Sequence, residues 1–253
     1  MISPSTRQLI EDIEIHSQAA IPALETEIYD GWHLRFARGH TRRANSVNVM
    51  APGTLPLATK IQHCEETYKA ARQPSHFRLT PLADSALEAA LAARGYQYSD
   101  PTEVRLLDLS EGTIPDPDPE VSIQCQKEKS WLDALSILTG QSAAREKTFG
   151  DMLDRISLEP AYGSIVRNGR IVACGLAVMS ADYVGLFEFV TDPAYLRRGL
   201  AAKIAGSLLA RAKNRGVNSA YLQVVQSNAA AVGFWERLGF TERLYGYHYR
   251  SKS

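Results

Sequence analysis

The stretch DPAYLRRGLAAKI, residues 192–204, places two arginines and a glycine where an apolar helical pattern begins. The first N–H groups of a helix have no partner inside it, and the helix dipole is positive at that end. Such an end favours an anion, and phosphate is the commonest one. The alternative is a tight turn at Gly199 with solvated arginines, and the stretch alone does not separate the two.

The flanking residues define the elements that must position this loop. Residues 161–191 hold three apolar runs, and Asn168-Gly169 between the first two predicts a hairpin turn. Apolar residues every three or four positions predict a helix from residue 200, ending at a left-handed cap on Gly216. The strand SAYLQVV, the helix SNAAAVGFWERLGF and the strand LYGYHYR are expected to follow.

The composition limits the class of protein. The chain has 253 residues, is 45% hydrophobic and has zero formal net charge, which disfavours nucleic acid as a partner. Its three cysteines form no CxxC pair and its histidines have no metal-ligand spacing, so we expect a reduced compartment and no bound metal. The polar N-terminus resembles no signal peptide, and no apolar run is long enough to span a membrane. These features predict a soluble cytoplasmic protein.

A proline-rich segment divides the chain. Its three prolines oppose helix, and we predict a first domain at residues 1–112, a linker at 113–121 and a second domain at 122–253. Both halves read as helices and strands in alternation, which suggests two weak copies of one fold. The first copy lacks the arginine-glycine loop, and NVMAPGTLPLATKI stands in its place. The alternative is that any α/β chain shows such alternation.

The second half resembles the GNAT superfamily of acyl-CoA-dependent N-acetyltransferases. The family places a glycine and a small residue between a strand and a helix, followed by an asparagine and a helix ending in Gly-Phe. Here the loop is followed by matching residues, Asn228, Ala231, Trp235, Gly239 and Phe240. The resemblance covers about residues 161–250 and implies an α/β (α+β) fold. The first half is more distantly similar to the extra domain of bacterial two-domain GNAT proteins. We therefore expect two tandem GNAT-like domains, each a mixed, mostly antiparallel central sheet flanked by helices.

The resemblance implies a site for acetyl-CoA as co-substrate. Asn228 would contact the pantetheine arm, although an N-cap role explains an asparagine there equally well. Trp235 stands where the family has a tyrosine beside the cofactor thiol. The main chain of the strand before the loop would hold the arm, and the loop N–H groups would hold the diphosphate; these residues are Phe189, Val190, Thr191, Arg197, Arg198, Gly199, Leu200, Ala201 and Ala202.

Three positions depart from the family pattern. Leu196 replaces the first Gln or Arg of the loop, which backbone anion binding does not need. Trp235 replaces the tyrosine that protonates the thiolate, and an indole is no general acid. Gln223 replaces a glutamate found in the subfamily that acetylates ribosomal proteins, and Gln cannot act as a base. The acid and base of that subfamily are therefore both absent.

Glu188 is the candidate general base, because acidic residues are common at its position in the family and amine attack requires loss of a proton. The alternative is that Glu188, which alternates with Phe187 and Phe189, simply faces solvent or pairs with a local arginine. For the acid, a row of tyrosines at alternate positions is one candidate and unassisted thiolate departure another; packing explains such a row more often. The row is Tyr245, Tyr247 and Tyr249.

The sequence thus predicts direct acetyl transfer from acetyl-CoA to a primary amine of a small molecule. No Cys, Ser–His or Lys arrangement suggests an acyl-enzyme. A protein N-terminus or lysine is the alternative acceptor, and a non-catalytic acyl-CoA sensor or scaffold is the alternative function. The sequence does not distinguish a monomer from a homodimer.

Overall fold

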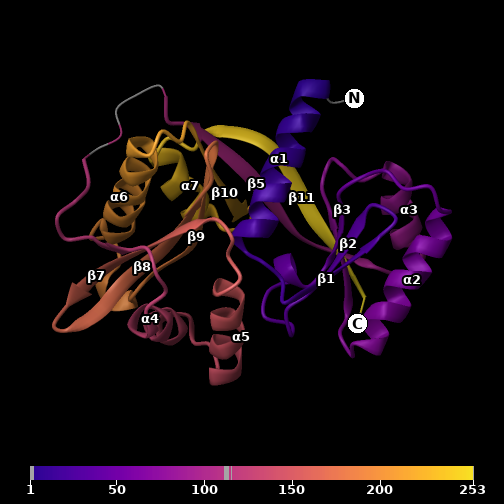
Figure 1. The fold of residues 1–253 in the computed structure, drawn as a ribbon, viewed down its shortest axis with the longest axis horizontal. Helices are drawn as coiled ribbons and strands as arrows, with labels where there is room; N and C mark the ends of the chain where they lie inside the picture. Colours follow the sequence, from indigo (N-terminus) through magenta and orange to yellow (C-terminus); the bar gives the residue numbers. More distant parts are fainter. Residues whose placement is uncertain (1–2, 111–113, 115, 253) are drawn as a thin grey trace. The chain divides into compact units, whose positions relative to one another are not determined.

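The computed structural model describes residues 3–110, 114 and 116–252. The chain divides into two compact units (Figure 1). Unit 1 comprises Met1–Val104, Val224–Ala229 and Arg243–Ser253, and unit 2 comprises Arg105–Gln223 and Ala230–Glu242. The predicted linker falls partly on residues outside the described ones, and the predicted domain limits stay a prediction.

Unit 1 contains the first elements of the chain and its last strand. A hairpin turn at Asp30-Gly31 joins strands β1 and β2. The later strands β3 and β4 are each followed by a helix. The elements are α1 (Pro4–Ala20), β1 (Glu25–Tyr29), β2 (Trp32–Phe36), η1 (Arg42–Ala44), β3 (Val47–Val49), α2 (Leu57–Ala70), β4 (Ser75–Leu79), α3 (Ser85–Ala93), most of β5 (Gln97–Asp108) and most of β11 (Glu242–Lys252).

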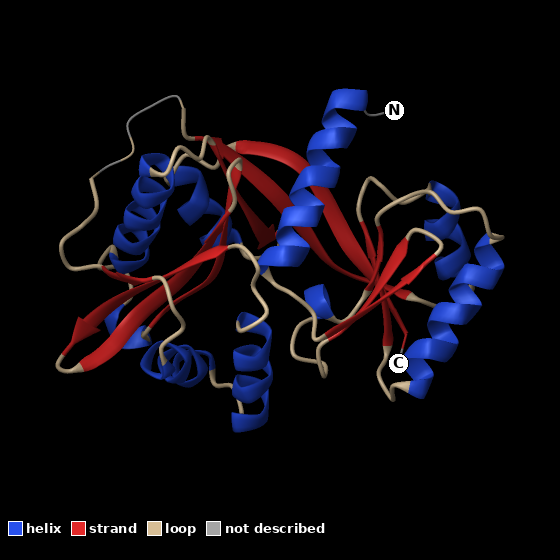
Figure 2. Cartoon of the chain, in the orientation of Figure 1, coloured by secondary structure: helices blue, strands red, loops and turns tan. Residues whose placement is uncertain are grey.

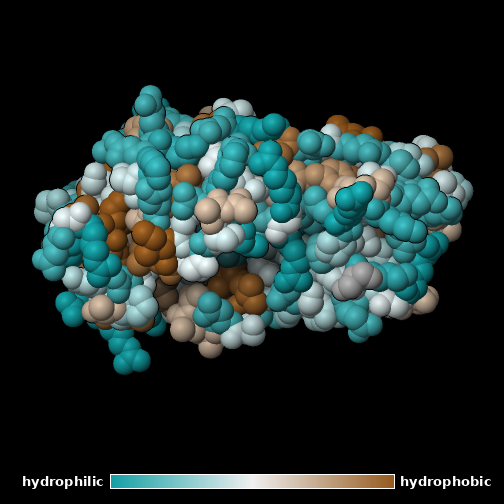
Figure 3. Space-filling model, turned by 90° about the horizontal axis from the view of Figure 1, so that it is seen from below, coloured by the Kyte–Doolittle hydropathy of each residue, from teal (hydrophilic) through white to brown (hydrophobic). Residues whose placement is uncertain are grey.

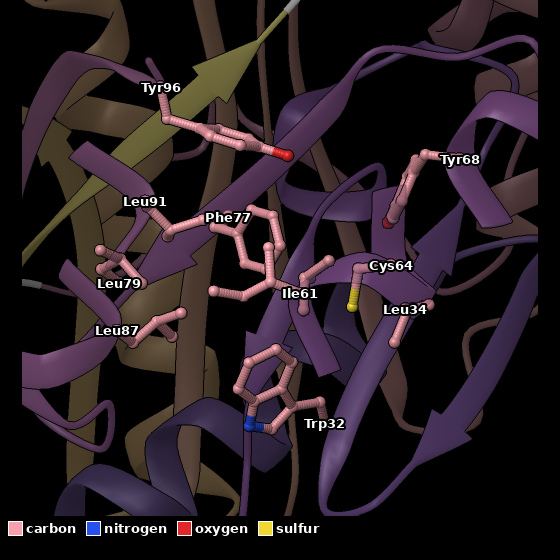
Figure 4. Packing of buried hydrophobic residues seen from close by; sticks show 11 residues of the cluster. Trp32, Leu34, Ile61, Cys64, Tyr68, Phe77, Leu79, Leu87, Leu91 and Tyr96 are labelled. Carbon is pink, nitrogen blue, oxygen red and sulfur yellow. The ribbon is translucent and has the colours of Figure 1, made fainter. Parts of the chain in front are cut away.

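One face of the unit 1 strands carries an apolar core against α2 and α3. Trp32 and Leu34 alternate along β2, and Ile61 and Cys64 of α2 lie one turn apart, so each element presents one apolar face. Figure 4 shows these side chains packed with Phe77 of β4. The alternation that the sequence shows in this segment is therefore the inside–outside pattern of a covered sheet.

The opposite face of the same strands carries a buried polar cluster. Glu14 of α1 is 1% exposed; it accepts two hydrogen bonds from the guanidinium of Arg78 and one from the hydroxyl of Tyr245. The ring of Tyr247 lies 3.7 Å from the Arg78 guanidinium carbon. Strand β11 reaches this cluster because it pairs antiparallel with β4, with Tyr249 opposite Arg78.

Unit 2 holds the predicted arginine-glycine loop. Helices α4 and α6 both pack on β8, and they lie on opposite sides of the β7–β8 strands in Figure 1. The elements are β6 (Ser122–Gln124), α4 (Lys129–Thr139), α5 (Ala143–Leu153), β7 (Glu159–Arg167), β8 (Arg170–Met179), β9 (Tyr183–Thr191), η2 (Pro193–Tyr195), α6 (Leu200–Asn214), β10 (Ser219–Val225) and α7 (Ala229–Arg237).

Two local predictions in unit 2 are confirmed. Asn168 and Gly169 form the β7–β8 turn with φ values of 50° and 76°, as a two-residue hairpin requires. Helix α6 ends at Asn214, and Gly216 adopts a φ of 84°, the left-handed conformation expected of a glycine cap. Turn chemistry alone specified both positions.

The strands form one eleven-stranded sheet, in the order β1-β2-β3-β4-β11-β5-β10-β9-β8-β7-β6 (Figure 2). Strand β3 pairs in parallel with β4 and β9 with β10, while β1–β2, β2–β3, β4–β11, β6–β7, β7–β8 and β8–β9 are antiparallel. The mixed α/β class is confirmed. The sequence predicted one sheet per domain, and the structure differs because β11 takes a place between β4 and β5.

The surface is mainly polar, with isolated apolar side chains. Ile15, Ile28 and Ile137 are 60%, 70% and 77% exposed, and Figure 3 shows brown patches separated by hydrophilic side chains on one face. Scattered side chains of this kind are normal for a protein surface. Within the described ranges, no helix is both long and apolar enough to cross a membrane.

Candidate functional site

A hydrogen-bonded carboxylate fixes the end of β9. Asp192 is 9% exposed, and its Oδ1 accepts the backbone N–H of Ala194 at 2.8 Å, capping η2. Its Oδ2 lies 2.6 Å from Nη1 of Arg170, at the start of β8. The Ala194 N–H and the Arg170 guanidinium hold the pKa of Asp192 below its usual range. These two contacts of Asp192 fix the direction in which the chain leaves β9.

The loop after η2 presents a run of unsatisfied backbone donors. Among the described residues, no backbone hydrogen bond of normal geometry is donated by the N–H groups of residues 197–202. Gly199 precedes α6 with a φ of 75°, and Arg197 has a φ of 60°. A Cβ added at Gly199 would meet nothing within 4 Å. The geometry that the sequence suggested for an anion site, free N–H groups at a helix start, is present.

The two loop arginines lie at the surface, where they add positive charge. Arg198 donates to the carbonyl of Ala194 at 3.2 Å, and its guanidinium carbon lies 5.0 Å from the Tyr195 ring centre. Arg197 is exposed as well. Leu196, at the position where the family has Gln or Arg, is 56% exposed. Positive side chains thus flank the donors without covering them.

Strand β9 carries a β-bulge at Glu188. Cys174 of β8 pairs with Val190 and Leu176 pairs with Phe187, so Gly175 alone faces Glu188 and Phe189. Glu188 has a φ of 54°, in the left-handed region that a non-glycine residue rarely adopts. Bulges next to active sites re-aim side chains, and strained backbone is concentrated there. Glu188 is half-buried, and its role as a base stays a prediction.

Burial dominates the chemistry of the neighbouring cysteine. Cys174 is 1% exposed, as expected of a core residue, and burial together with the charge of Glu188 raises the pKa of its thiol to about 12. A thiol with such a pKa is not a nucleophile near neutral pH. No acyl-enzyme through Cys174 is supported.

The parallel strands β9 and β10 separate where the predicted binding residues begin. Their pairing runs from Tyr183–Ser219 to Leu186–Leu222, although β9 continues to Thr191 and β10 to Val225. Phe189, Val190 and Thr191 lie in the unpaired part of β9 relative to β10. A gap between splayed parallel strands exposes main-chain groups to a ligand, and their carboxyl ends are where ligands of open α/β sheets bind.

Trp235 packs in an aromatic cluster rather than standing free. It is 7% exposed, and its ring centre lies 5.0 Å from Phe189 and 5.7 Å from Phe240, both in edge-to-face contact. The Phe189 ring also fills the space beside Gly175, where an added Cβ would come within 2.8 Å of it. The indole of Trp235 therefore forms part of the aromatic surface beside the β-bulge at Glu188.

Asn228, in the residues assigned to unit 1, is exposed, and its N–H donates to the carbonyl of Val225 at 3.0 Å. Gln223 is half-buried on β10. Asn228 and Gln223 both take part in interactions within the protein. Their predicted cofactor contacts stay a prediction.

The tyrosine row is explained by packing. Tyr245, Tyr247 and Tyr249 are about 5% exposed and belong to the polar cluster of unit 1 around Glu14 and Arg78. Burial raises the pKa of Tyr245 and of Tyr249 above the usual range for tyrosine. A buried tyrosine whose hydroxyl is bonded to a buried carboxylate is not available as a general acid.

Sequence reasoning missed Asp192 and Arg170. An Asp-Pro pair after a strand is a recognised helix-start signal and would have identified Asp192 as a cap. Nothing near Arg170 in the sequence indicates its partner, because the contact joins residues 22 positions apart through the pairing of β8 and β9.

No group of three or more His, Cys, Asp or Glu side chains is placed to hold a metal ion in the part of the chain that the structure describes.

Comparison with known proteins identifies relatives over the whole chain. Residues 8–250 match the family described as "Probable histone acetyltransferase Rv0428c C-terminal". The chain is 26% identical over 246 residues to an uncharacterized N-acetyltransferase, YobR, of Bacillus subtilis, covering 96% of this chain and 98% of that protein. It is also 36% identical over 78 residues to the ribosomal protein bS18-alanine N-acetyltransferase of Escherichia coli, covering 31% of this chain and 53% of that enzyme.

Two solved structures share the fold over nearly the whole chain. A GCN5-related N-acetyltransferase from Kribbella flavida superposes with a TM-score of 0.69 at 13% identity, covering 100% of this chain and 96% of that one. A tandem GNAT protein from the clavulanic acid biosynthesis pathway has a TM-score of 0.67 at 14% identity, covering 95% and 87%. At these identities the likeness concerns the fold alone.

Proposed function

Because the chain belongs to this Rv0428c C-terminal acetyltransferase family and is a GNAT-type N-acetyltransferase, we propose that it moves the acetyl group of acetyl-CoA directly to a primary amine of a small molecule. We further propose that unit 1 is a degenerate copy of the GNAT fold that does not carry the reaction. The cytoplasmic location expected from the sequence stays a prediction.

The observation that carries the proposal is the run of unpaired N–H groups at residues 197–202. They would hold the diphosphate of CoA through short N–H···O bonds at the positive end of α6. Arg197 and Arg198 would add attraction over a longer range, and the small side chains of Gly199 and Ala201 would let the phosphates approach the backbone. Binding there would direct the pantetheine arm along β9.

The splayed strands would then receive the thioester. Main-chain groups of Phe189, Val190 and Thr191 would align the arm, and a backbone N–H near the bulge would stabilise the oxyanion as the carbonyl becomes tetrahedral. Asn228 would hydrogen-bond the arm, and Trp235 would bound it through the aromatic wall it forms with Phe189.

Glu188 would act as the general base. It would take a proton from the ammonium so that the neutral amine attacks the thioester carbon and the N–C bond forms. The positively charged nitrogen of the tetrahedral intermediate then loses a second proton to water, the C–S bond breaks and CoA leaves as a thiolate. Because a thiol has a pKa of about 8.5, the thiolate can depart unassisted and take its proton from water. No general acid is needed from the chain.

The proposal is tested by following free thiol when the protein is incubated with acetyl-CoA and a panel of small primary amines. Amine-dependent thiol release supports transfer, whereas saturable CoA binding without turnover on any amine would support the sensor. Glu188→Gln should lower kcat by about 10²–10⁴-fold with little effect on CoA affinity. Asp182→Asn, at an exposed position just before the same strand, is the matched control and should leave kcat unchanged. Equal activity of Glu188→Gln at every pH would remove the assignment of the base.

A protein amine is the second candidate acceptor. It is favoured by the 36% identity to the bS18-alanine enzyme across 78 residues, which correspond to about half of that protein. Peptides with an N-terminal alanine and peptides with an internal lysine, added to the same panel, distinguish the candidates. A kcat/KM for a peptide above that for every small amine would decide for a protein substrate.

A further inference from the structure

Unit 1 repeats the order of elements that forms the candidate site in unit 2. Strand β3 leads through residues 50–56 into α2, and the next strand, β4, pairs with β3 in parallel and leads into α3. In unit 2, β9 leads into α6, and β10 pairs with β9 in parallel and leads into α7. A cavity of about 450 Å³ lies at the helix starts of unit 1, with Trp32, Gly53, Leu55, Lys60, Leu82 and Leu87 among its lining residues.

The backbone donors beside this cavity are already occupied by an anion. The carboxylate of Asp30 accepts the N–H of Thr54 at 2.9 Å, the N–H of Leu55 at 3.0 Å and the hydroxyl of Thr54 at 3.2 Å. The ammonium of Lys60 lies 3.0 Å from the same carboxylate and is 4% exposed. Pro56, the next residue, has no N–H to offer. This arrangement of donors around a carboxylate is the one that a phosphate would require.

The surrounding chain is shaped to hold Asp30 in place. Asp30 and Gly31 turn between β1 and β2 with φ values of 43° and 81°. A Cβ added at Gly53 would come within 2.0 Å of Asp30 Oδ2 and 2.2 Å of Lys60 Nζ, so only glycine allows this approach. The hydrogen bonds from Thr54 and Leu55 hold the pKa of Asp30 well below its usual range, so the carboxylate is charged throughout the neutral pH range.

We infer that Asp30 is a built-in anion that closes unit 1 to phosphate-bearing ligands. A phosphate entering this position would meet a fixed negative charge and donors that are already bonded, and like charges at contact cost several kcal/mol. Asp30 therefore determines which of the two helix starts takes a diphosphate. If the proposed function of unit 2 holds, the chain binds one CoA.

The test reads the backbone amides directly, with inorganic pyrophosphate as the probe. In the unaltered protein, NMR signals of Thr54 and Leu55 should not shift saturably with pyrophosphate. Asp30→Gly removes the carboxylate and suits the positive φ at this turn. In this variant the NMR signals of the two amides should shift saturably with pyrophosphate. The apparent Kd should be at least about tenfold below the lowest Kd that the data on the unaltered protein allow.

Asp30→Asn is the matched control, because it keeps the shape and the left-handed turn while removing the charge. Its side chain still accepts hydrogen bonds at this position, so any saturable shift of Thr54 and Leu55 should be weaker than in Asp30→Gly. The inference is overturned by saturable shifts of these amides in the unaltered protein, or by a folded Asp30→Gly variant in which they do not shift. If Asp30→Gly does not fold, a saturable shift that appears in Asp30→Asn but not in the unaltered protein supports the inference, and a shift in the unaltered protein or none in Asp30→Asn overturns it. The NMR signals of the amides of residues 197–202 report separately on the proposed CoA site in unit 2. A failure of the proposed function can therefore be distinguished from a failure of the inference about Asp30.

Discussion

Helices α2 and α6 both follow a strand whose parallel neighbour comes next in the chain, yet their first turns differ in what satisfies the backbone donors. At α2 the preceding N–H groups bond to the carboxylate of Asp30, with Lys60 behind it. At α6 no backbone hydrogen bond is donated by the N–H groups of residues 197–202 among the described residues, and two arginines flank them. The same local construction is thus a closed structural contact in one unit and, in our proposal, the anion site in the other.

The same contrast extends to the strands. In unit 1 the polar side chains of β4 and β11 are used internally, since Glu14 bonds to both Arg78 and Tyr245. In unit 2, β9 is bulged at Glu188 and separates from β10. We propose that unit 1 does not bind the cofactor because its own side chains take up the hydrogen bonds that a ligand would need. Four measurements test this difference between the two units.

The largest effect is expected from Glu14→Gln in unit 1. It leaves the charge of Arg78 buried without a counter-charge, which costs about 3–5 kcal/mol of unfolding free energy. Urea denaturation measures the loss. Glu11→Gln on the same helix removes only a partly exposed pair with Arg7 and should cost under about 0.5 kcal/mol. A change below about 1 kcal/mol for Glu14→Gln would show that the cluster is not the internal anchor described.

The next effect reproduces the closed state of unit 1 in unit 2. Ala201→Glu places a carboxylate in the first turn of α6, where it favours the helix dipole but repels a diphosphate. We expect CoA affinity to fall by about 100-fold, measured by calorimetry, while Tm is unchanged or higher. Ala201→Gln has the same size without charge and should lose far less. An undiminished affinity in Ala201→Glu would place the diphosphate elsewhere.

A smaller effect is expected from Arg170→Met, which removes one partner of Asp192. The Ala194 N–H still holds the other carboxylate oxygen, so the loop is loosened rather than lost. KM for acetyl-CoA should rise about three- to tenfold with kcat unchanged, since the pair acts on loop position and not on chemistry. Arg167→Met in the same hairpin is the control. A drop in kcat with constant KM would contradict this role.

The smallest effect concerns pH. The pKa of Asp192 is lowered in the folded protein, so the contribution of its contacts is present above the unfolded pKa of about 3.9 and is lost as pH falls through the folded pKa. The NMR signal of the Ala194 N–H should stay constant from pH 7 to about pH 5 and move only at lower pH. In Arg170→Met its midpoint should lie at higher pH, because a positive neighbour is gone. A midpoint that does not rise would mean that Arg170 has no influence on the carboxylate.

Features that depend only on neighbouring residues could be predicted from the amino-acid sequence. The turn at Asn168-Gly169, the start of α6 after Gly199 and its end before Gly216 follow from backbone preferences within a few positions. The position of the loop before α6 was predictable for the same reason, because a strand, a proline, a glycine and an apolar helix specify it locally. Alternation in the last strand predicted that its tyrosines share a face.

The partners that those faces meet follow from contacts between distant segments. Strand β11 pairs with β4, so the tyrosine row packs around Glu14. Asp30 closes one loop and Arg170 steadies another through contacts between residues far apart in the chain. The alternation of residue types along a strand determines which face of the strand each side chain occupies, but not which other strand pairs with it. Strand pairing depends on long-range contacts that no local pattern encodes.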